Sequence, residues 1–451
     1  MDYSDILTSN LAWLETMYQK GGYGGPVVHY WKDSLEYIGP GIDWRYEGLL
    51  TGLITFFKKS DTTIWLRKAE NVAQDIIVSQ LRNSSFRNSK FEANPGCGGT
   101  PHEAAVDIGL LELAKILKTE RKKWKKYFFV ADRNLKTFHL SRLFDKSVKA
   151  FKNSTRTDFF VPNKIATTIE ALIKHYELSS NANLLRRFVI PAGDFILTQQ
   201  ILNENEPIFG GIYQSANSKT PFVMSFYNAR CIPALILLYR SITDERYLDA
   251  AMLVGKFLEK MALREGGFAH DFSFVENKWI KSKYPIWIAG SAEVVRALLL
   301  LNEFGGKFSV SKHIEFIKRG LDYNGGFRTS IGINFKNKEK STTEYETNWK
   351  DNLHVAGWNT MVFRLFSMLS RKIPEFEKIT EKSFPTLISR CKNNFILIET
   401  QENISVIQEK ENKFKLNFLF PKKSKYSLGR PKIFPRKIIA RVREIIQSFR
   451  C

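Results

Sequence analysis

The first ~370 residues consist of stretches in which apolar positions recur with helical spacing, separated by loops rich in Gly and Pro. One kind of stretch follows a Gly-rich loop and is apolar on every side, which predicts helices at 44–58, 103–118, 162–178, 225–242, 286–305 and 350–371. The other kind has one polar face, and predicts helices at 4–20, 62–80, 182–201, 245–263 and 311–320, with a sixth inside the Lys-rich segment 121–152. Helices that are apolar all round are buried, whereas amphipathic helices have a face that tolerates water. The alternation therefore predicts an inner and an outer ring of helices.

The order of the two kinds of helix predicts how the ring closes. The chain begins with an outer helix at 4–20, and the last inner helix, at 350–371, has no outer partner after it. If the first helix packs beside the last inner helix, six inner and six outer helices form six hairpins. The predicted fold class is therefore all-α, an (α/α)6 barrel or toroid over residues 1–372.

Two sequence patterns recur in the turns between these helices. Turns from an inner to an outer helix place Ser, Thr, Asp or Asn before a buried aromatic-Leu step, as in the segments 60–69 and 243–250 and, more weakly, 179–185. These polar residues are expected to be N-caps. Turns from an outer to an inner helix carry a Gly pair, which is expected to end the outer helix as a C-cap; the pairs start at Gly21, Gly210, Gly266 and Gly325.

With these turns the chain resembles the six-hairpin glycosidase-like superfamily of (α/α)6 barrels. That superfamily includes glycoside hydrolases, sugar epimerases and the toroid domains of polysaccharide lyases. The resemblance covers about residues 1–372 and rests on the helix order and on the spacing from Asp to the aromatic-Leu step. It implies a fold rather than a substrate, because the superfamily hosts several reactions.

The remainder of the chain has a different pattern. Residues 395–420 partly alternate between apolar and polar positions, which predicts a small β-containing appendage within 373–430. A basic amphipathic helix is predicted over 431–451; Ile438, Val442, Ile445, Ile446 and Phe449 share its apolar face. Such a helix either docks on the barrel or lies on an anionic membrane, and both alternatives stay open.

Composition and charge narrow the class of protein. The chain has 451 residues, of which 43% are hydrophobic and 25% charged, which excludes a disordered, collagenous or disulfide-stapled protein. Its 68 Lys and Arg outnumber 46 Asp and Glu, and the net charge of +22 favours an anionic partner. Residues 413–451 hold twelve basic residues and one acid, which is half of this excess.

The four cysteines are scattered and form no CxxC pair, which favours a reducing compartment and gives no zinc site. Neither the first residues nor any apolar run has the character of a signal peptide or of a membrane span. We therefore predict a cytoplasmic protein, peripheral to the membrane if the C-terminal tail contacts it. Neither a metal nor any other cofactor is expected, and neither is specific nucleic-acid binding.

The long loops between outer and inner helices predict the position of the site. Turns at the opposite end are only a few residues long, and long ordered loops in a compact domain usually carry function. These loops and the helix starts after them are rich in His and aromatic residues, and sugar rings stack on aromatic side chains. The alternative is that these aromatic residues wedge the loops onto the barrel.

Clusters of ionisable residues at these helix starts supply the candidate catalytic residues: Asp43, Glu47, His102, Glu103, Tyr227, His270 and Asp271. Carboxylates and His transfer protons, and Tyr beside Arg can do so in lyases. The structural alternatives are that Asp43 and Glu47 serve the helix N-terminus, that Glu103 belongs to a capping box, and that Tyr227 packs in the core. Candidate substrate-binding residues are Trp31, Trp44, Arg45, Asn228, Arg230, Trp287, Glu293, Glu344, Trp349 and His354.

Three functions remain open at this point. The favoured one is a carbohydrate-active enzyme of the glycoside hydrolase, polysaccharide lyase or uronate/sugar epimerase type, acting on an anionic or lipid-linked glycan. The first alternative is a non-catalytic glycan-binding or scaffold protein. The second is a toroid related to terpenoid cyclases or prenyltransferases, which would need a deep apolar lumen. The cyclase acid motif and the prenyltransferase zinc ligands are not found in the sequence.

Overall fold

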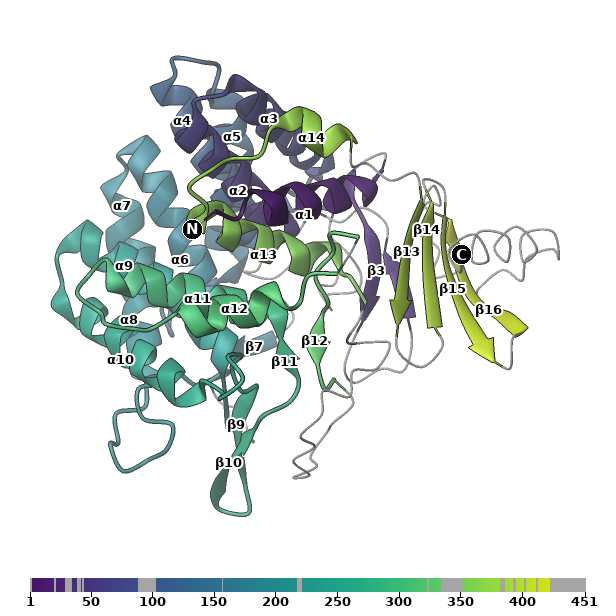
Figure 1. Ribbon diagram of the computed structural model, residues 1–451. Helices are drawn as coiled ribbons and strands as arrows, with labels where there is room; N and C mark the ends of the chain where they lie inside the picture. The colour runs from purple at the N-terminus through teal and green to yellow at the C-terminus, as the bar shows by residue number, and fades with distance from the viewer. Residues whose placement is uncertain are drawn as a thin grey trace.

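The computed structural model is a barrel of helices with a small β-sheet near the C-terminus (Figure 1). It describes residues 2–19, 22–28, 35–38, 42, 44–87, 103–155, 157–216, 221–322, 324–333, 351, 353–381, 386–391, 395–400, 403–410 and 413–421. For the strands at 25–28 and 35–38 and for those beyond 385, the description covers the backbone alone. The C-terminal helix predicted over 431–451 lies outside these ranges.

Six inner helices form a closed ring. They are α2 (Trp44–Ser60), α4 (Ala104–Thr119), α6 (Pro162–Ser179), α9 (Ser225–Ile242), α11 (Ile288–Asn302) and α13 (Ala356–Leu369). Each packs against the next in this order, and α13 packs against α2, so that α2 and α9 lie on opposite sides of the ring. The predicted (α/α)6 barrel is therefore confirmed.

The outer helices cover this ring with one apolar face each. They are α1 (Ser4–Thr16), α3 (Thr63–Ser79), α5 (Lys125–Asn134) with the π-helical η3 (Leu135–Leu143), α7 (Ala182–Leu184) with η4 (Leu185–Val189) and α8 (Ile190–Thr198), α10 (Glu245–Met261) and α12 (Ser311–Lys318). In α10, for example, Tyr247, Ala251 and Leu258 are buried at helical spacing.

The first helix closes the barrel as predicted. Helix α1 packs against α13 and against the short helix α14 (Phe376–Glu381). The side-chain amide of Asn10 donates to Asn359 Oδ1 in α13 at 2.9 Å, and the Tyr3 N–H donates to Ser370 Oγ at 3.1 Å. These hydrogen bonds join the two ends of the barrel sequence.

Several predicted helix ends are wrong because short strands take them over. The helix expected over 4–20 ends at Thr16, and β1 (Tyr18–Gln19) then pairs with β2 (Gly22–Tyr23). The inner helix expected from 286 begins two residues later, because β11 (Ile286–Trp287) pairs with β12 (Ser330–Ile331). Helix α13 begins only at Ala356, since His354 lies in a bridge with Arg328.

The Gly pairs have a different role from the predicted C-caps. Gly210, Gly266 and Gly325 have φ of +86°, +108° and +86°, but each follows the end of its outer helix by several residues. A Cβ on Gly210 would lie 2.4 Å from Leu253 O, and one on Gly325 would lie 2.1 Å from Ser9 O. Each turn thus packs its backbone against the next outer helix, a close approach that only glycine allows. The contact of Gly325 with α1 belongs to the closure of the ring.

The predicted N-caps are confirmed in two of the three turns. The side chains of Asn181 and Asp244 accept hydrogen bonds from the N–H groups two residues on, at 3.2 and 3.1 Å. Asp61 instead adopts a left-handed φ of 54° directly after α2, as Ser180 and Thr243 do after their inner helices. A residue with a left-handed φ thus ends the inner helix in all three turns.

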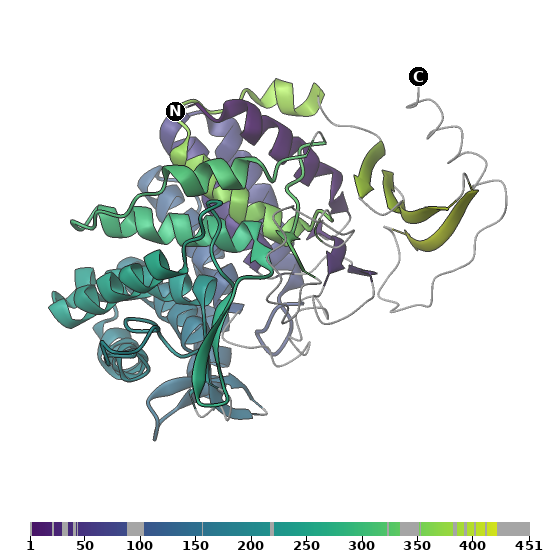
Figure 2. The same ribbon diagram turned by 60° about the horizontal axis from the view of Figure 1, so that its bottom comes forward.

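Small antiparallel sheets occupy the longer connections. They are formed by β3 (Gly25–Val28) with β4 (Leu35–Ile38), by β5 (Phe144–Asp145) with β6 (Ala150–Ser154) and β7 (Thr157–Phe160), and by β8 (Phe222–Met224) with β9 (Asp271–Val275) and β10 (Lys278–Ser282). The β9–β10 hairpin projects beyond the helices (Figures 1 and 2). The predicted β-containing extension is confirmed as the antiparallel sheet β13 (Thr386–Cys391), β14 (Phe395–Thr400), β15 (Asn403–Lys410) and β16 (Lys413–Pro421).

Candidate active site

A cluster of charged side chains fills the centre of the ring. Arg230 of α9 donates to both carboxylate oxygens of Glu47 on the opposite helix α2, at 2.7 and 2.8 Å. Arg364 of α13 donates to Glu47 Oε1 at 2.6 Å, and Arg230 Nε donates to Thr167 Oγ1 at 3.2 Å. Because α2 and α9 face each other across the ring, this bidentate pair spans the lumen.

Further groups complete the central ion cluster, which we define as Glu47, Glu170, Arg230, Glu293, Arg296 and Arg364. Arg296 pairs with Glu293 at 2.9 Å, and Arg230 lies 3.7 Å from Glu170 and 4.0 Å from Glu293. Three carboxylates thus meet three guanidinium groups from five of the six inner helices. The formal charge of the cluster is zero.

The arginines keep these buried carboxylates ionised. Burial alone would raise the pKa of Glu47, but the charges of Arg230 and Arg364 outweigh it and lower that pKa to about 2. The pKa of Glu293 is also lowered, since Arg296 and Arg364 outweigh its burial. At neutral pH neither carboxylate holds a proton, so neither can act as a general acid.

The remaining inner helix, α4, carries a carboxyl pair of the opposite character. Glu103 accepts hydrogen bonds at 3.3 Å from the Phe86 N–H and the Asn134 side chain, and burial raises its pKa to about 8. Asp107, one helical turn deeper, is fully buried, and neither of its oxygens has a hydrogen-bond partner within the described ranges. Burial raises the pKa of Asp107, and the neighbouring Glu103 raises it further. The pKa of Glu103 thus lies above neutral pH, so this carboxyl group is mostly protonated there.

Aromatic side chains line the N-terminal ends of α2, α11 and α13. The rings of Trp287 and Trp358 stack at 4.5 Å, and Trp44 meets Trp358 edge-on at 5.9 Å. The ring of His270 follows at 6.4 Å from Trp287, and its Nδ1 is hydrogen-bonded to Asp271 Oδ2. Ser273 Oγ donates to the other Asp271 oxygen at 2.6 Å, which fixes the carboxylate. We call Trp44, Trp287, Trp358, His270 and Asp271 the mouth group.

Comparisons with known proteins agree with this architecture. No protein-family model matches the sequence, and no curated protein matches it significantly. Solved structures do match. A cellobiose 2-epimerase from Bacillus thermoamylovorans has a TM-score of 0.56 at 14% identity, covering 80% of this chain and 98% of that chain. The chain has the six-hairpin glycosidase-like (α/α)6 fold.

Two further solved structures share this six-hairpin barrel. An unsaturated glucuronyl hydrolase specific for heparin has a TM-score of 0.55 at 11% identity, over 84% of this chain and 98% of that chain. An α-1,6-mannanase from a Salegentibacter species, in complex with α-1,6-mannotriose, has a TM-score of 0.52 at 13% identity, over 82% and 100%. That mannanase is an inactive variant with two consecutive aspartates replaced by asparagine. At such identities the likeness concerns the fold and not the reaction.

The six-hairpin barrel brings together some of the predicted site residues. Trp44, Trp287, His270 and Asp271 belong to the mouth group, and Glu47, Arg230 and Glu293 belong to the central ion cluster. Tyr227 is half-buried at the start of α9, with its ring 4.2 Å from that of Phe226. Asp43, His102, Trp31, Glu344 and Trp349 lie outside the described residues.

Other predicted site residues serve the fold. The Asn228 side chain accepts from the Ile212 N–H at 2.7 Å and donates to Ile212 O at 3.1 Å, and Asn359 clamps Phe327 in the same way. The Asn228 side-chain amide therefore holds the turn that follows the Gly pair at Gly210. His354 is fully buried, lies 3.4 Å from Asp322 and meets Trp13 edge-on, on the side of α1. Arg45 is also buried and donates to Tyr23 O at 3.3 Å.

Sequence reasoning missed Glu170, Arg296 and Arg364 of the central ion cluster. The signal was clearest for Arg364, the one charged residue in α13, and for Arg296, which shares the otherwise uncharged α11 with Glu293, whereas α6 holds several charged residues besides Glu170. The argument that drew attention to Glu293, that a buried acid needs a reason, applies equally to these three.

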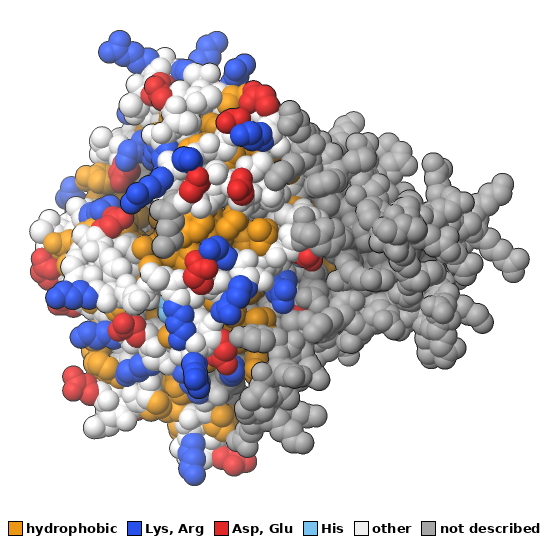
Figure 3. Space-filling model, in the orientation of Figure 1, with side chains coloured by type: hydrophobic (Ala, Val, Ile, Leu, Met, Phe, Trp, Pro, Cys, Tyr) orange, Lys and Arg blue, Asp and Glu red, His pale blue; other side chains and the backbone are white. Residues whose placement is uncertain are grey.

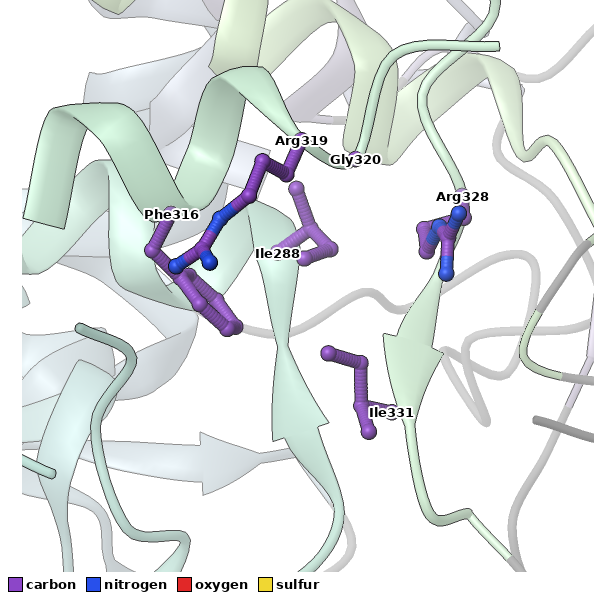
Figure 4. Close-up of a pocket in the computed structure, with 6 residues that line it drawn as sticks. All are labelled: Ile288, Phe316, Arg319, Gly320, Arg328 and Ile331. Carbon is purple, nitrogen blue, oxygen red and sulfur yellow. The ribbon is translucent and has the colours of Figure 1, made fainter. Parts of the chain in front are cut away.

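A pocket of ≈ 230 Å³ lies between the start of α11, the end of α12 and β12 (Figure 4). Ile288, Phe316 and Ile331 form its apolar floor, and the guanidinium groups of Arg319 and Arg328 stand at its sides. Apart from Ile288 at the start of α11, no inner-helix residue lines it, so we do not assign the site there. Within the described ranges no group of three or more His, Cys, Asp or Glu could hold a metal ion, and no helix is both long and apolar enough to span a bilayer.

Proposed function

We propose that the protein is a carbohydrate-active enzyme whose site lies at the N-terminal ends of the inner helices. The observation that carries this proposal is the mouth group, in which a His–carboxylate pair adjoins a stack of indole rings. Indole faces stack on the C–H faces of sugar rings, while a His oriented by a carboxylate is a common proton-transfer group in enzymes. The saccharide names of the epimerase, glucuronyl hydrolase and mannanase with the same fold support the class of substrate.

Each part of the site has its own role in this proposal. His270 transfers the proton, and Asp271, itself held by Ser273, orients the imidazole and stabilises its protonated form. Trp287 and Trp358 provide the stacking platform. The central ion cluster forms the floor beneath them, and its three carboxylates and three arginines give it a formal charge of zero. A His acid/base favours epimerisation or elimination over hydrolysis by a carboxylate pair.

An anionic glycan is the substrate class that we favour. Six helix N-termini meet at this end of the barrel, and their free N–H groups and positive dipole ends attract a carboxylate or phosphate group. The net charge of +22 adds a long-range attraction. We further propose that the protein acts in the cytoplasm on a free or lipid-linked glycan, with the basic C-terminal tail as a membrane contact.

A non-catalytic glycan-binding protein is the second candidate. The central ion cluster favours this candidate, because Glu47 and Glu293 are ionised and paired with arginines and so cannot donate a proton to a substrate. The toroid of the cyclase and prenyltransferase type is disfavoured, because it requires an apolar lumen and six charged groups meet in this one.

A substrate panel tests the proposal. The purified protein is incubated with neutral and uronic-acid oligosaccharides, and the products are followed by absorbance of unsaturated uronates, by reducing ends and by NMR of the sugar configuration. We expect turnover of at least one uronic-acid substrate, and Trp287→Ala should raise its KM. His270→Gln should lower kcat by about 10²–10⁴-fold, the usual contribution of general acid–base catalysis.

The matched control is another buried His–Asp pair, which lies far from the mouth group. His175 of α6 is hydrogen-bonded to Asp132 at 2.6 Å near the C-terminal end of its inner helix, remote from the mouth. His175→Gln should leave kcat within a few-fold of the wild type. Binding of an oligosaccharide without turnover would favour the second candidate, and an active His270→Gln variant would overturn the assignment of the proton-transfer group.

A further inference from the structure

The positive charge of the protein is concentrated in two segments. Residues 115–149 hold twelve Lys and Arg and three Asp and Glu, a net charge of +9. Residues 413–451 hold a net +11. Out of the total of +22, the other 377 residues therefore carry only +2. Charge that serves solubility alone is expected to be spread evenly over the surface. The concentration of positive charge at 115–149 therefore indicates a specific role for this segment.

This segment forms one outer wall of the barrel, from the end of α4 through α5 and η3 to the β5–β6 turn. The exposed positions of α5 and η3 are Lys125, Lys126, Phe129, Arg133, Lys136, Thr137, Ser141 and Arg142. They include five cations and no acid. Asp132 of the same helix is half-buried and engaged by His175 and Lys136. Lys and Arg side chains project from the top of the molecule in Figure 3, where Figure 1 shows α4 and α5.

A large aromatic side chain stands in the middle of these cations. Phe129 is 58% exposed, although most phenylalanines that the structure describes are buried or half-buried. Lys125 and Lys126 precede it by one helical turn and Arg133 follows it by one, so all four share a face. We define Lys122, Lys125, Lys126, Phe129, Arg133, Lys136 and Arg142 as the cationic stripe.

We infer that the cationic stripe docks the barrel on the surface of an anionic lipid bilayer. Lysines and arginines attract anionic headgroups, and an exposed Phe gains by entering the boundary between headgroups and acyl chains. The stripe is the outer face of a helix and therefore convex, which suits a deformable planar surface. A polysaccharide or nucleic acid would be better held by a concave track with several stacked aromatic rings.

The stripe also sets the orientation of the docked protein. Helix α5 packs beside α4 on the outside of the ring, and together with η3 it forms a continuous helical stretch of 19 residues. Such contact lays the barrel on its side, with the ring axis parallel to the bilayer and the mouth group opening along the membrane surface. Binding to lipid is measured without any glycan, so this inference can fail or hold independently of the proposed function.

Sedimentation with vesicles tests the inference on the full-length chain. Wild type and variants are mixed with vesicles of phosphatidylcholine alone, or of phosphatidylcholine and phosphatidylglycerol at three to one, at low and moderate salt. We expect binding to the anionic vesicles only, weakened by salt. The triple variant Lys122→Gln/Lys125→Gln/Lys126→Gln should bind about 100-fold more weakly, at about fivefold per cation near the surface. Phe129→Ala should bind about tenfold more weakly through lost apolar contact.

Matched variants separate the stripe from charge and apolar area in general. Lys256→Gln/Lys278→Gln/Lys307→Gln removes three exposed lysines elsewhere, and Phe159→Ala removes another exposed Phe, on β7. All variants keep the C-terminal tail, so its contribution is common to them. Both control variants should bind as the wild type does, and melting curves should show that all variants are folded.

Two results would overturn the inference. One is equal vesicle binding by the stripe triple variant and the control triple variant. The other is a Phe129→Ala variant with unchanged vesicle binding, together with a stripe triple variant that loses affinity for heparin as strongly as for vesicles. The second result would identify an anionic polymer as the partner in place of the membrane.

Discussion

Two sets of buried carboxyl groups inside the same barrel behave in opposite ways. In the central ion cluster, Glu47 and Glu293 face arginines, and the pKa of Glu47 falls to about 2. In the α4 pair, no arginine of the described ranges is among the causes that shift the pKa of Glu103 or of Asp107, and that of Glu103 rises to about 8. All four groups are almost fully buried. Burial therefore does not decide the state of a carboxyl group in this protein, whereas the presence of a guanidinium group does.

The two sets of carboxyl groups are also expected to affect the stability of the protein in different ways. A neutralised ion cluster resists the removal of any one member, because the partner would remain as an uncompensated buried charge. For Glu103, whose pKa is raised by burial, a stability cost grows as the pH rises and the carboxyl group loses its proton. Four predictions test this comparison, in order of decreasing effect.

The largest effect is expected from removing the central cation. Arg230→Met leaves Glu47 short of its bidentate partner and should lower the free energy of unfolding by about 3–5 kcal/mol, as for other broken buried ion pairs. Denaturant unfolding measures this. The control Arg246→Met breaks the ion pairs of an exposed arginine with Asp194 and Asp244, and should cost less than about 1 kcal/mol. Equal small losses in both variants would show that the cluster does not stabilise the barrel.

The next effect is a pH dependence that arises from Glu103. Its folded-state pKa of about 8 exceeds the ordinary value of 4.5, so its contribution to stability is full below pH 4.5 and is lost as pH rises to 8. The loss in this window is about 1.4 kcal/mol per pH unit. Glu103→Gln cannot release a proton, and its stability relative to the wild type should therefore rise by about 2–3 kcal/mol between pH 6 and 8.

Glu112 offers a control on the same helix. Burial would raise its pKa, but Lys174 outweighs burial and lowers it. The stability of Glu112→Gln relative to the wild type should stay constant between pH 6 and 8, because that carboxylate is ionised throughout. A Glu103→Gln profile parallel to that of Glu112→Gln would contradict the raised pKa of Glu103.

A smaller effect of opposite sign is expected at Asp107. Neither of its oxygens has a hydrogen-bond partner within the described ranges. Asp107→Leu should therefore raise the free energy of unfolding by about 1 kcal/mol, which is measured as a higher melting temperature. The same change at Glu293 should lower it, since Arg296 would lose its partner. Two shifts of the same sign would mean that the two regions do not differ.

The smallest effect belongs to Glu170. Its Oε2 lies 3.7 Å from Arg230 Nη2, beyond hydrogen-bond distance, while Arg230 is already held by Glu47. Glu170→Gln should therefore change the free energy of unfolding by about 1 kcal/mol or less. A loss as large as that of Arg230→Met would show that Glu170, and not Glu47, is the principal partner of the arginine.

The helices could be predicted closely because their signal is local. Apolar spacing alone placed the start of α2 at 44 and both ends of α9 at 225 and 242, as the structure has them. It failed where a short strand competes with the helix, as at Ile286 and Trp287, since pairing with β12 is not visible in the neighbouring sequence. The glycine turns were recognised, but their contact with the next outer helix was not, because Gly325 and Ser9 are far apart in the chain.

The sequence allowed the residue types of the candidate site to be predicted, but not which side chains meet in the folded protein. The sequence identified Glu47, Arg230 and Glu293 as charged residues at the starts of apolar helices, and His270 with Asp271 as a pair of neighbours. It could not separate Asn228, which holds a turn, from a residue that faces the lumen, because both occupy the first turn of an inner helix. The roles of the mouth group remain predictions for the substrate panel.

The sequence by itself determined the alternation of buried and amphipathic helices, and with it the six-hairpin barrel, because helical periodicity depends on residues three and four positions apart. Only the tertiary structure decided which carboxylate meets a guanidinium group. Glu47 and Arg230 are 183 residues apart, and ring closure brings them within 2.7 Å, while Glu103 accepts hydrogen bonds from the uncharged Phe86 N–H and Asn134 side chain. The charge state of a buried acid depends on the nearest opposite charge in space, and for Glu47 that charge comes from the far side of the barrel.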